Sequence, residues 1–583
     1  MVGNGASEAP GSLVGVIGGG TMGAGIAQLA VQAGHAVAVY DALDGAAARA
    51  VEGIGKRLDA LAAKGKITTE ESEAAKARLS ALDGLTGLKD AVLVVEAVIE
   101  DLGVKQKLFA ELEDVVDADC GLATNTSSLS ISAIAAGLRD PGRLVGMHFF
   151  NPAPLMPLVE IVEGIATDPA RRDAVRAHAE AWGKTTVQCR STPGFIVNRV
   201  ARPFYAEALR AYEEQAADFA TIDAVVRESG GFKMGPFELV DLIGLDVNLA
   251  VSTSVWEATG YDPRYTPAWT QKEYVAAKRL GRKTGRGFHD YGENAAKPAP
   301  AYEPARELEQ SETLRPGSFR LSELFDPTRD DRPSSFLLSK SFGRTATSYG
   351  DGRILVDLML DPEAGPTVAL APAADTPPRG LEMAVAYLQS LGKKVVVLED
   401  VPGLVLTRTV ARLVNEAVDA MYRGDADEDD IDTAMRLGVN YPRGPLEWGA
   451  DLGFAYICDV LDNLENVYRD GRYRASPLLR QLAHADALMG APLLNHEPPP
   501  LVRSVMVQVN RDVAEARTYA AGVMQQLGMA RVATKFSVVV PEAEKDSEGQ
   551  EGSEQPKEPK EPKEPKEPKK PEEPEASDQP PAP

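Results

Sequence analysis

Short apolar runs of strand length recur over the first third of the chain, and segments with helical periodicity separate most of them. The expected strands are residues 13–18, 36–40, 91–98, 121–124, 144–150, 158–162 and 184–189. Two helices are expected within 44–80. Strands that alternate with helices are typical of a parallel sheet with helices on both faces. The pattern predicts an α/β domain over residues 13–190, preceded by a disordered N-terminus at 1–12.

Helical periodicity takes over after this domain. The stretch from Pro193 to about Ala277 is predicted to be rich in helices, and the turn-rich sequence GRKTGRGFHDY at 281–291 closes it. We therefore predict an all-α domain over residues 191–291. The Pro- and charge-rich stretch that follows, 292–332, is typical of a linker.

A glycine motif directly follows the first expected strand. Gly18, Gly20 and Gly23 form GxGxxG between a strand and a helix. In that context the first glycine allows a tight turn, the second lets the backbone approach a pyrophosphate, and the third lets the helix pack on the strand. The helix N-terminus faces the anion. The motif predicts a dinucleotide site, against the simpler alternative of a glycine-rich turn that binds no nucleotide.

The second expected strand ends at an acidic residue, Asp41, which lies 18 residues after Gly23. A carboxylate at this place accepts hydrogen bonds from ribose hydroxyls and repels a 2′-phosphate. Ala42 and Leu43 follow, so no arginine is present there to accommodate such a phosphate. The sequence therefore predicts NAD rather than NADP. The residues expected to hold it here are Gly18, Gly20, Thr21, Met22, Gly23 and Asp41.

The expected strand at 144–150 carries one residue that can exchange a proton near neutral pH, His148. Glu160 follows twelve residues later in the next apolar run, and Asn151-Pro152 breaks the first strand. Two neighbouring strands can therefore bring an imidazole and a carboxylate face to face. The carboxylate would fix the tautomer, and the other ring nitrogen could act as a general base. The simpler alternative is a core histidine with a surface glutamate.

Small polar residues occupy two further positions of interest. Asn125-Thr126-Ser127-Ser128 follows a strand at the end where open α/β sheets bind ligands, although a serine there could equally cap the next helix. Asn198 lies in the first turns of the first long helix. It is either a solvent-exposed position or a substrate contact.

The composition narrows the class of protein. A formal net charge of −24 argues against nonspecific nucleic-acid binding. No apolar run approaches the ~20 residues of a membrane helix, and the N-terminus lacks the features of a secretory signal. The three cysteines are scattered, which suits a reducing cytoplasm and argues against a zinc site. We expect a cytoplasmic protein with no nucleic acid, membrane or metal as partner. The basic turn Lys64-Gly65-Lys66 is either a ligand contact or an ordinary solvated turn.

The last part of the chain repeats an earlier one. Glu207 recurs as Glu416, and several further pairs share this offset of 209 residues. A constant offset without a gap indicates a duplicated domain. We predict a second helical copy over 401–536, preceded at 333–400 by a vestigial Rossmann-like segment that carries no GxGxxG. The tail at 541–583 repeats Lys-Glu-Pro and has no residue that could build a core, so it is predicted to be disordered.

Only the first copy is expected to be catalytic. The offset, extrapolated towards the N-terminus, places Asp357, Ala369 and Thr407 at the positions of His148, Glu160 and Asn198. The segment 334–397 contains no histidine at all. The second half is therefore predicted to be structural.

These residues together resemble the 3-hydroxyacyl-CoA dehydrogenase family. The resemblance is carried, in family order, by IGGGTMGAGIA (17–27), VVEAVIE (94–100), TNTSSLSI (124–131), HFFNPAPLMPLVEIV (148–162) and PGFIVNR (193–199). The duplicated helical domain is similar to that of the longer bacterial members, which resemble 3-hydroxybutyryl-CoA and 3-hydroxyadipyl-CoA dehydrogenases. The resemblance implies a Rossmann NAD domain, an all-α substrate and dimerisation domain, and NAD-dependent oxidation of (S)-3-hydroxyacyl-CoA, in fatty-acid β-oxidation or phenylacetate-type aromatic degradation.

The resemblance also implies roles for single residues. His148 would be the general base and Glu160 its orienting partner, while Ser127 and Asn198 would contact the substrate. Lys64 and Lys66 would bind the CoA phosphates. The cofactor would lie near Glu100, Lys105, Asn125 and Asn151. The family dimerises through its helical domain, and a chain that carries two such domains can satisfy this interface internally. The expected state is therefore a monomer or a homodimer.

Two other functions fit parts of the pattern. A 6-phosphogluconate-type dehydrogenase resembles this fold, but it uses a lysine base on the helical domain and lacks the HFFNP strand. A non-catalytic NAD-binding structural or sensor protein on the same scaffold is the second alternative. The joint presence of Ser127, His148, Glu160 and Asn198 counts against it.

Overall fold

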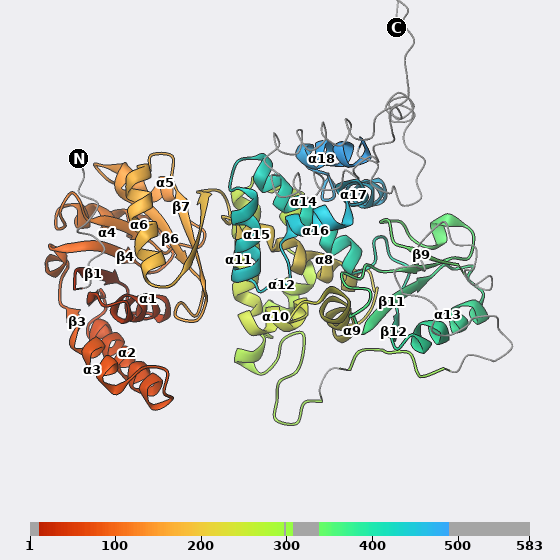
Figure 1. Cartoon of the computed structure of the whole chain (residues 1–583), viewed down its shortest axis with the longest axis horizontal. Coiled ribbons are helices and arrows are strands. Elements are labelled where there is room, and N and C mark those ends of the chain that lie inside the picture. Colours follow the sequence, from red (N-terminus) through yellow and green to blue (C-terminus); the bar gives the residue numbers. More distant parts are fainter. Residues whose placement is uncertain (1–10, 297–298, 307–336, 489–583) are drawn as a thin grey trace, which may run out of the picture. The chain divides into compact units, whose positions relative to one another are not determined.

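The computed structural model describes residues 11–296, 299–306 and 337–488 (Figure 1). The predicted disordered tail, most of the predicted N-terminal segment and linker, and the last part of the second helical copy lie outside the described residues. Within the described part of the chain, no single helix is long and apolar enough to cross a membrane. One sharply bent pair, Pro236–Ile243 with Leu245–Ala258, passes that test by length and composition only.

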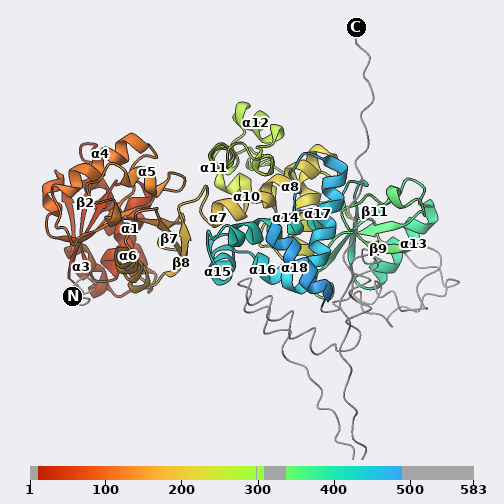
Figure 2. The ribbon, with the colours of Figure 1, turned by 90° about the horizontal axis from the view of Figure 1, so that it is seen from above.

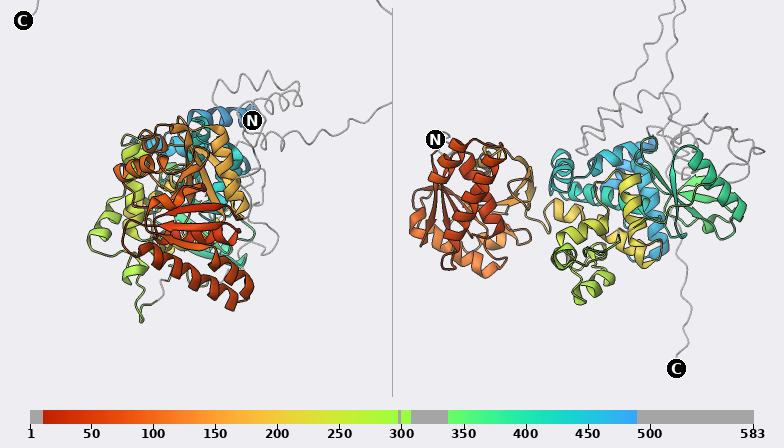
Figure 3. Two further views of the ribbon diagram at one scale, coloured as in Figure 1. Left: turned by 90° about the vertical axis from the view of Figure 1, so that its left-hand side faces the viewer. Right: turned by 90° about the horizontal axis from the view of Figure 1, so that it is seen from below.

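A sheet forms the centre of the N-terminal domain (Figure 3). It has eight strands in the order β3-β2-β1-β4-β5-β6-β7-β8. Its strands are β1 Leu13–Ile17, β2 Ala36–Tyr40, β3 Leu79–Leu82, β4 Ala91–Glu96, β5 Gly121–Thr124, β6 Leu144–Phe149, β7 Leu158–Glu163 and β8 Thr185–Arg190. Neighbouring strands are parallel except for β6 and β7. The order reverses next to β1, as in doubly wound folds that bind dinucleotides. The α/β prediction is confirmed.

Helices cover both faces of this sheet. They are α1 Thr21–Gln32, α2 Ala46–Ala63, α3 Thr69–Ala77, α4 Leu102–Glu113, α5 Ile131–Ala135 and α6 Pro169–Ala181. Alternate strand residues point to opposite cores, because the side-chain period of a strand is two. Val145 and Met147 of β6 belong to the core that α1 and α6 cover. Leu144 belongs to the other core, together with Phe109 of α4, and His148 shares this second face by alternation.

The sequence missed one strand. Residues 79–80 were expected at the end of the second helix, but Leu79–Leu82 form β3, which pairs in parallel with β2 at the edge of the sheet. Local periodicity does not predict such a strand, because only its neighbour in the sheet stabilises it.

Two sets of helices follow the sheet. The first comprises α7 Val197–Val200, α8 Arg202–Glu213, α9 Phe219–Ala224 with a π-helical turn at Val225–Ser229, α10 Pro236–Ile243, α11 Leu245–Ala258 and α12 Trp269–Ala276. The second comprises α14 Leu406–Tyr422, α15 Glu428–Gly438, α16 Pro445–Leu452, α17 Phe454–Tyr468 and α18 Pro477–Leu488. Both regions were predicted to be all-α, and the helices of their described residues agree with this.

The segment between the two helical sets forms a small sheet of order β12-β11-β10-β9. Its elements are β9 Leu338–Lys340, β10 Ile354–Val356, β11 Thr367–Pro372, α13 Pro378–Ser390 and β12 Lys394–Val397. As in the pair β6–β7, the two central strands are antiparallel. The Asp357 amide donates to the Ala369 carbonyl at 3.0 Å, and His148 lies opposite Glu160 in the first sheet. This register agrees with the extrapolated offset of 209 residues.

The two helical sets pack against each other through α8 and α14, which lie side by side (Figures 1 and 2). Equivalent glutamates, Glu207 of α8 and Glu416 of α14, each reach across to the other set. Tyr473 donates to Glu207 at 2.7 Å, and the Nε of Arg199 donates to Glu416 at 3.0 Å. Reciprocal contacts of this kind are typical of a two-fold interface between subunits. Here the interface forms within one chain.

Candidate active site

The site is built around two strands of the first sheet. His148 on β6 and Glu160 on β7 are opposite each other in the antiparallel register, and the imidazole Nδ1 lies 2.6 Å from Oε2 of the carboxylate. His148 is 5% exposed and Glu160 is completely buried. A hydrogen bond from Nδ1 to a carboxylate places the ring proton there, so the other ring nitrogen, Nε2, is left as an acceptor. The structure therefore brings this predicted pair together.

The second oxygen of Glu160 is also occupied. Oε1 accepts hydrogen bonds from the backbone amides of Ile196 at 3.0 Å and Val197 at 2.9 Å, where α7 begins. The carboxylate therefore joins the sheet to the first helical set at the same time as it orients the imidazole. These partners on both oxygens fix the rotation of the carboxylate.

Aromatic rings and an asparagine flank the imidazole. The ring centroids of Phe150 and Phe195 lie 4.6 Å and 5.7 Å from that of His148. Asn125, at the carboxyl end of β5, accepts from the Phe149 amide through Oδ1 at 2.8 Å. Asn125 is thereby anchored beside the histidine, and its role in cofactor binding stays a prediction. Phe195 was not among the predicted site residues.

The Asn125–Ser128 loop is organised by Glu100. Oε1 of this carboxylate accepts from the Thr126 hydroxyl at 2.7 Å and from the amides of Ser127 and Ser128 at 2.9 Å and 3.0 Å. Burial raises the pKa of Glu100, but the hydrogen bond from Thr126 and the charge of Lys105 outweigh it, and the net pKa is lowered. Glu100 and Ser127, predicted for cofactor and substrate, therefore lie in direct contact.

Lys105 is more deeply placed than a direct ligand contact would require. It is 1% exposed, and its Nζ lies 2.6 Å from Oε1 of Glu96 and 3.4 Å from Oε2 of Glu100. Glu96 also accepts from the Thr124 hydroxyl at 2.6 Å. The expectation that Lys105 lies near the cofactor stays a prediction. The sequence pointed to neither its pairing with Glu96 nor the role of Glu96 itself.

The glycine motif has the geometry that a dinucleotide needs. Gly18 has a positive φ of 101°, and a Cβ at Gly23 would lie 1.9 Å from the Gly18 carbonyl, so both positions require glycine. A Cβ at Gly20 would meet nothing within 4 Å, which leaves its backbone open to a ligand. Asp41 accepts from the Gly19 amide at 2.7 Å through Oδ2. The residues present therefore fit an NAD molecule.

Other predicted site residues are exposed or half-buried, and the structure does not test their roles in binding. Lys64 and Lys66 are exposed in the turn after α2, and Asn151 is exposed just past the end of β6. Asn198 is half-buried on α7, next to the two amides that bind Glu160. Their roles in binding stay predictions. Thr21 and Met22 open helix α1 between Gly20 and Gly23 of the glycine motif.

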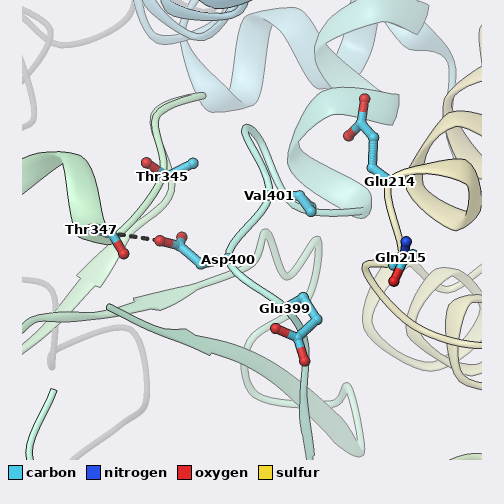
Figure 4. Close-up of a pocket in the computed structure, with 7 residues that line it drawn as sticks. All are labelled: Glu214, Gln215, Thr345, Thr347, Glu399, Asp400 and Val401. Carbon is cyan, nitrogen blue, oxygen red and sulfur yellow. Dashed lines mark hydrogen bonds between the residues drawn. The ribbon is translucent and has the colours of Figure 1, made fainter. Parts of the chain in front are cut away.

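A large pocket of about 810 Å³ lies elsewhere (Figure 4). Its described lining residues are Glu214, Gln215, Thr345, Thr347, Glu399, Asp400 and Val401. None of these is cationic, and none is a predicted site residue. A pocket with three acidic side chains does not suit the phosphates of a nucleotide or of CoA. We therefore do not assign the active site to this pocket, despite its volume.

Three family models match the chain. The NAD binding domain of 3-hydroxyacyl-CoA dehydrogenase matches residues 13–192, and the C-terminal domain of that family matches twice, at 194–291 and 403–491. The reduced Rossmann-fold domain of 3-hydroxybutyryl-CoA dehydrogenase matches residues 338–402. The predicted duplication and the predicted NAD domain are thereby confirmed.

Full-length relatives agree with these models. The chain is 45% identical over 477 residues to a 3-hydroxyadipyl-CoA dehydrogenase of Escherichia coli, which covers 81% of this chain and 97% of that protein. It is 40% identical to a probable 3-hydroxybutyryl-CoA dehydrogenase of Bacillus subtilis, over 48% of this chain and 98% of the relative. The crystal structure of a 3-hydroxybutyryl-CoA dehydrogenase from Escherichia coli matches with a TM-score of 0.76 and 44% identity, over 82% and 99% of the two chains.

Proposed function

This chain belongs to the 3-hydroxyacyl-CoA dehydrogenase family and is an NAD-dependent oxidoreductase of that family, and we propose that His148 is the general base of its reaction. The substrate would be an (S)-3-hydroxyacyl-CoA and the product a 3-oxoacyl-CoA. One observation carries this proposal: the buried imidazole of His148 lies 2.6 Å from the buried carboxylate of Glu160. Such a pair leaves one ring nitrogen ready to take a proton.

NAD, when bound, supplies the hydride-accepting chemistry. The chain's own residues handle the proton and the position of the substrate. Nε2 of His148 takes the proton of the C3 hydroxyl, and the Glu160 carboxylate stabilises the imidazolium that forms. Ser127 and Asn198 hold the C3 oxygen and the thioester carbonyl. Lys64 and Lys66, exposed on their turn, would supply local positive charge for the CoA phosphates in an otherwise acidic protein.

Two metabolic settings suit this reaction. Both fatty-acid β-oxidation and the degradation of aromatic acids through CoA thioesters require oxidation of a 3-hydroxyacyl-CoA. For the oligomeric state, the internal contacts of Glu207 and Glu416 favour a monomer over a dimer built on the same helical face. Sedimentation of the full chain would measure this directly.

The test is NADH absorbance with acetoacetyl-CoA as the substrate for the reverse reaction. His148→Gln should lower the rate by about 10²–10⁴-fold, the usual contribution of general base catalysis, and NAD affinity should change little. His484→Gln, an exposed histidine on α18, is the matched control and should keep the wild-type rate. A fully active His148→Gln enzyme would refute the proposal. NAD binding without any turnover by the wild type would instead favour the non-catalytic alternative.

A further inference from the structure

The first residue of α8, Arg202, is a buried cation close to the proposed active site. Its side chain is 7% exposed. The Nε atom donates to the Asn198 carbonyl at 2.7 Å, and Nη1 donates to the Ser252 hydroxyl at 3.1 Å. The guanidinium lies 4.9 Å from the ring centroid of Tyr205. All of these partners are neutral.

Arg202 differs in this respect from other buried arginines nearby. Arg199 pairs with three carboxylates, and Arg264 likewise pairs with three. Among the residues that the structure describes, no carboxylate forms an ion pair with Arg202. Burial lowers its pKa, but a guanidinium stays protonated at neutral pH. A buried charge is normally paired, so the missing partner points to an anion that comes from outside the chain.

A small pocket adjoins this guanidinium. Arg202 and Ser252 line it, together with Tyr205, Thr266 and Gln271 among others. Its free volume is about 20 Å³, which is room for one small polar group and not for a ring. A carboxylate oxygen is of that size. Ser252 accepts from Nη1 of Arg202 and donates to the Asn248 carbonyl at 2.9 Å, so the donor that lines this space is the guanidinium, and a guanidinium suits an anion.

The pocket lies beside Asn198, which is a proposed substrate contact. Arg202 follows Asn198 by four residues across the junction of α7 and α8, where Ala201 also has helical dihedral angles, so the rise between them is about 6 Å. The Nε hydrogen bond joins the two residues. Asn198 contacts the reacting part of the substrate in the function proposed above. A six-carbon dicarboxylyl chain carries its free carboxylate three carbons beyond the hydroxyl-bearing carbon, which is a similar reach.

The second helical copy shows that the fold does not need this polar pair. The offset of 209 residues places Ala411 at the position of Arg202 and Leu461 at that of Ser252. The same offset relates the starts of the helices concerned, Leu245 of α11 and Phe454 of α17. Both replacements are apolar and buried. An arginine in the first copy is therefore not explained by packing.

We propose that Arg202, held in position by Ser252, binds a carboxylate at the far end of the acyl chain and selects dicarboxylyl 3-hydroxyacyl-CoA substrates. This inference rests on the proposed function, because it concerns the acyl end of the same site. Arg202 touches no reacting atom. It determines specificity through a charge-assisted hydrogen bond that a chain with a methyl end cannot form.

The test compares two substrates of equal carbon number, 3-hydroxyadipyl-CoA and 3-hydroxyhexanoyl-CoA. The wild type should favour the first in kcat/KM by about 10²-fold or more, since a site built for a polar group rejects analogues that lack it. Arg202→Met should lower this preference by about 10²-fold. Arg202→Lys should retain part of it, because the charge remains without the planar fork. Arg227→Met removes a half-exposed arginine of the same helical copy and should leave the preference unchanged.

A second measurement needs no variant. Adipyl-CoA and hexanoyl-CoA both lack the reacting hydroxyl, and adipyl-CoA should be the stronger competitive inhibitor of the wild type by a similar factor. Equal kcat/KM values and equal inhibition in the wild type would overturn the inference, even if Arg202→Met failed to fold. Equal losses on both substrates in a folded Arg202→Met enzyme would also overturn it. Failure of the proposed function is distinct, because no 3-hydroxyacyl-CoA would then show turnover that depends on His148.

Discussion

Replacement of Glu160 by glutamine separates the chemistry of the site from its fold. In the wild type, Oε2 of Glu160 lies 2.6 Å from Nδ1 of His148, while Oε1 accepts from the Ile196 and Val197 amides. In Glu160→Gln the side-chain oxygen can keep both amide hydrogen bonds. Its NH₂ group then faces Nδ1 and donates to it. This reverses the tautomer, so Nε2 carries the proton and cannot accept another.

The two expected effects differ greatly in size. A base held in the wrong tautomer, and without a charge to stabilise the imidazolium, should lose about 10³–10⁴ in kcat, or about 4–5.5 kcal/mol in the barrier. The stability should fall by only about 1 kcal/mol, because one hydrogen-bonding arrangement replaces another. Glu160→Ala instead leaves the Ile196 and Val197 amides without an acceptor. Each should cost about 1–3 kcal/mol of the free energy of unfolding.

The assay is steady-state NADH formation from 3-hydroxybutyryl-CoA, beside urea unfolding followed by circular dichroism. NAD affinity, measured by fluorescence titration, should be the same in Glu160→Gln and the wild type. Glu163→Gln is the matched control, since Glu163 ends the same strand and pairs with Arg172. It should keep the wild-type kcat. A Glu160→Gln enzyme with kcat within about threefold of the wild type would refute the role of the carboxylate in orienting the base.

Three further outcomes are expected. Lys105→Met should destabilise the protein to urea by about 3–5 kcal/mol, because it leaves the fully buried Glu96 without its cation, and adding Glu96→Gln should recover most of that loss. Asp41→Ala with Ala42→Arg should narrow the preference for NAD over NADP, and equal use of both cofactors by the wild type would contradict the reading of Asp41. Thr407→Ala should leave turnover intact but cost about 1 kcal/mol of stability, because the Thr407 hydroxyl donates one buried hydrogen bond. NAD titration of the wild type should give one site per chain, and two sites would show that the second copy also binds cofactor.

The sequence predicted the contact between His148 and Glu160 because its signals were local. An apolar strand, a break at Asn151-Pro152 and a second apolar strand predict two neighbouring strands, and the spacing of twelve residues then places His148 opposite Glu160. The glycine motif was equally local, since its three glycines lie within one turn between a strand and a helix. Period and spacing were sufficient for these features.

Features that depend on distant partners were not predictable in this way. Lys105 was assigned to the cofactor, but the sequence did not show that Glu96 would be its buried partner. Nothing in the sequence distinguishes Arg202 from other basic residues. It differs only in the described structure, where no carboxylate forms an ion pair with it. The edge strand β3 likewise exists because β2 provides a neighbour. In each of these cases the role of the residue or strand depends on which groups lie beside it in the folded chain.

The second copy shows which part of the site the fold itself requires. Asp357 aligns with His148, yet its carboxylate accepts from the Val405 amide at 3.0 Å and the Leu406 amide at 2.7 Å. These amides are the counterparts, 209 residues later, of the two that Glu160 binds. Burial raises the pKa of Asp357, although the hydrogen bond from Leu406 opposes this.

A buried carboxylate that joins the sheet to the first helix is therefore present in both copies, although it comes from β7 in the first and directly follows β10 in the second. Only the first copy adds a histidine to it, and the described part of the second sheet contains none. The carboxylate is then a structural feature of both copies, and in the proposed mechanism the first copy also uses it to orient a base. This double role explains why Glu160→Ala should damage stability and turnover together, whereas Glu160→Gln should damage mainly turnover.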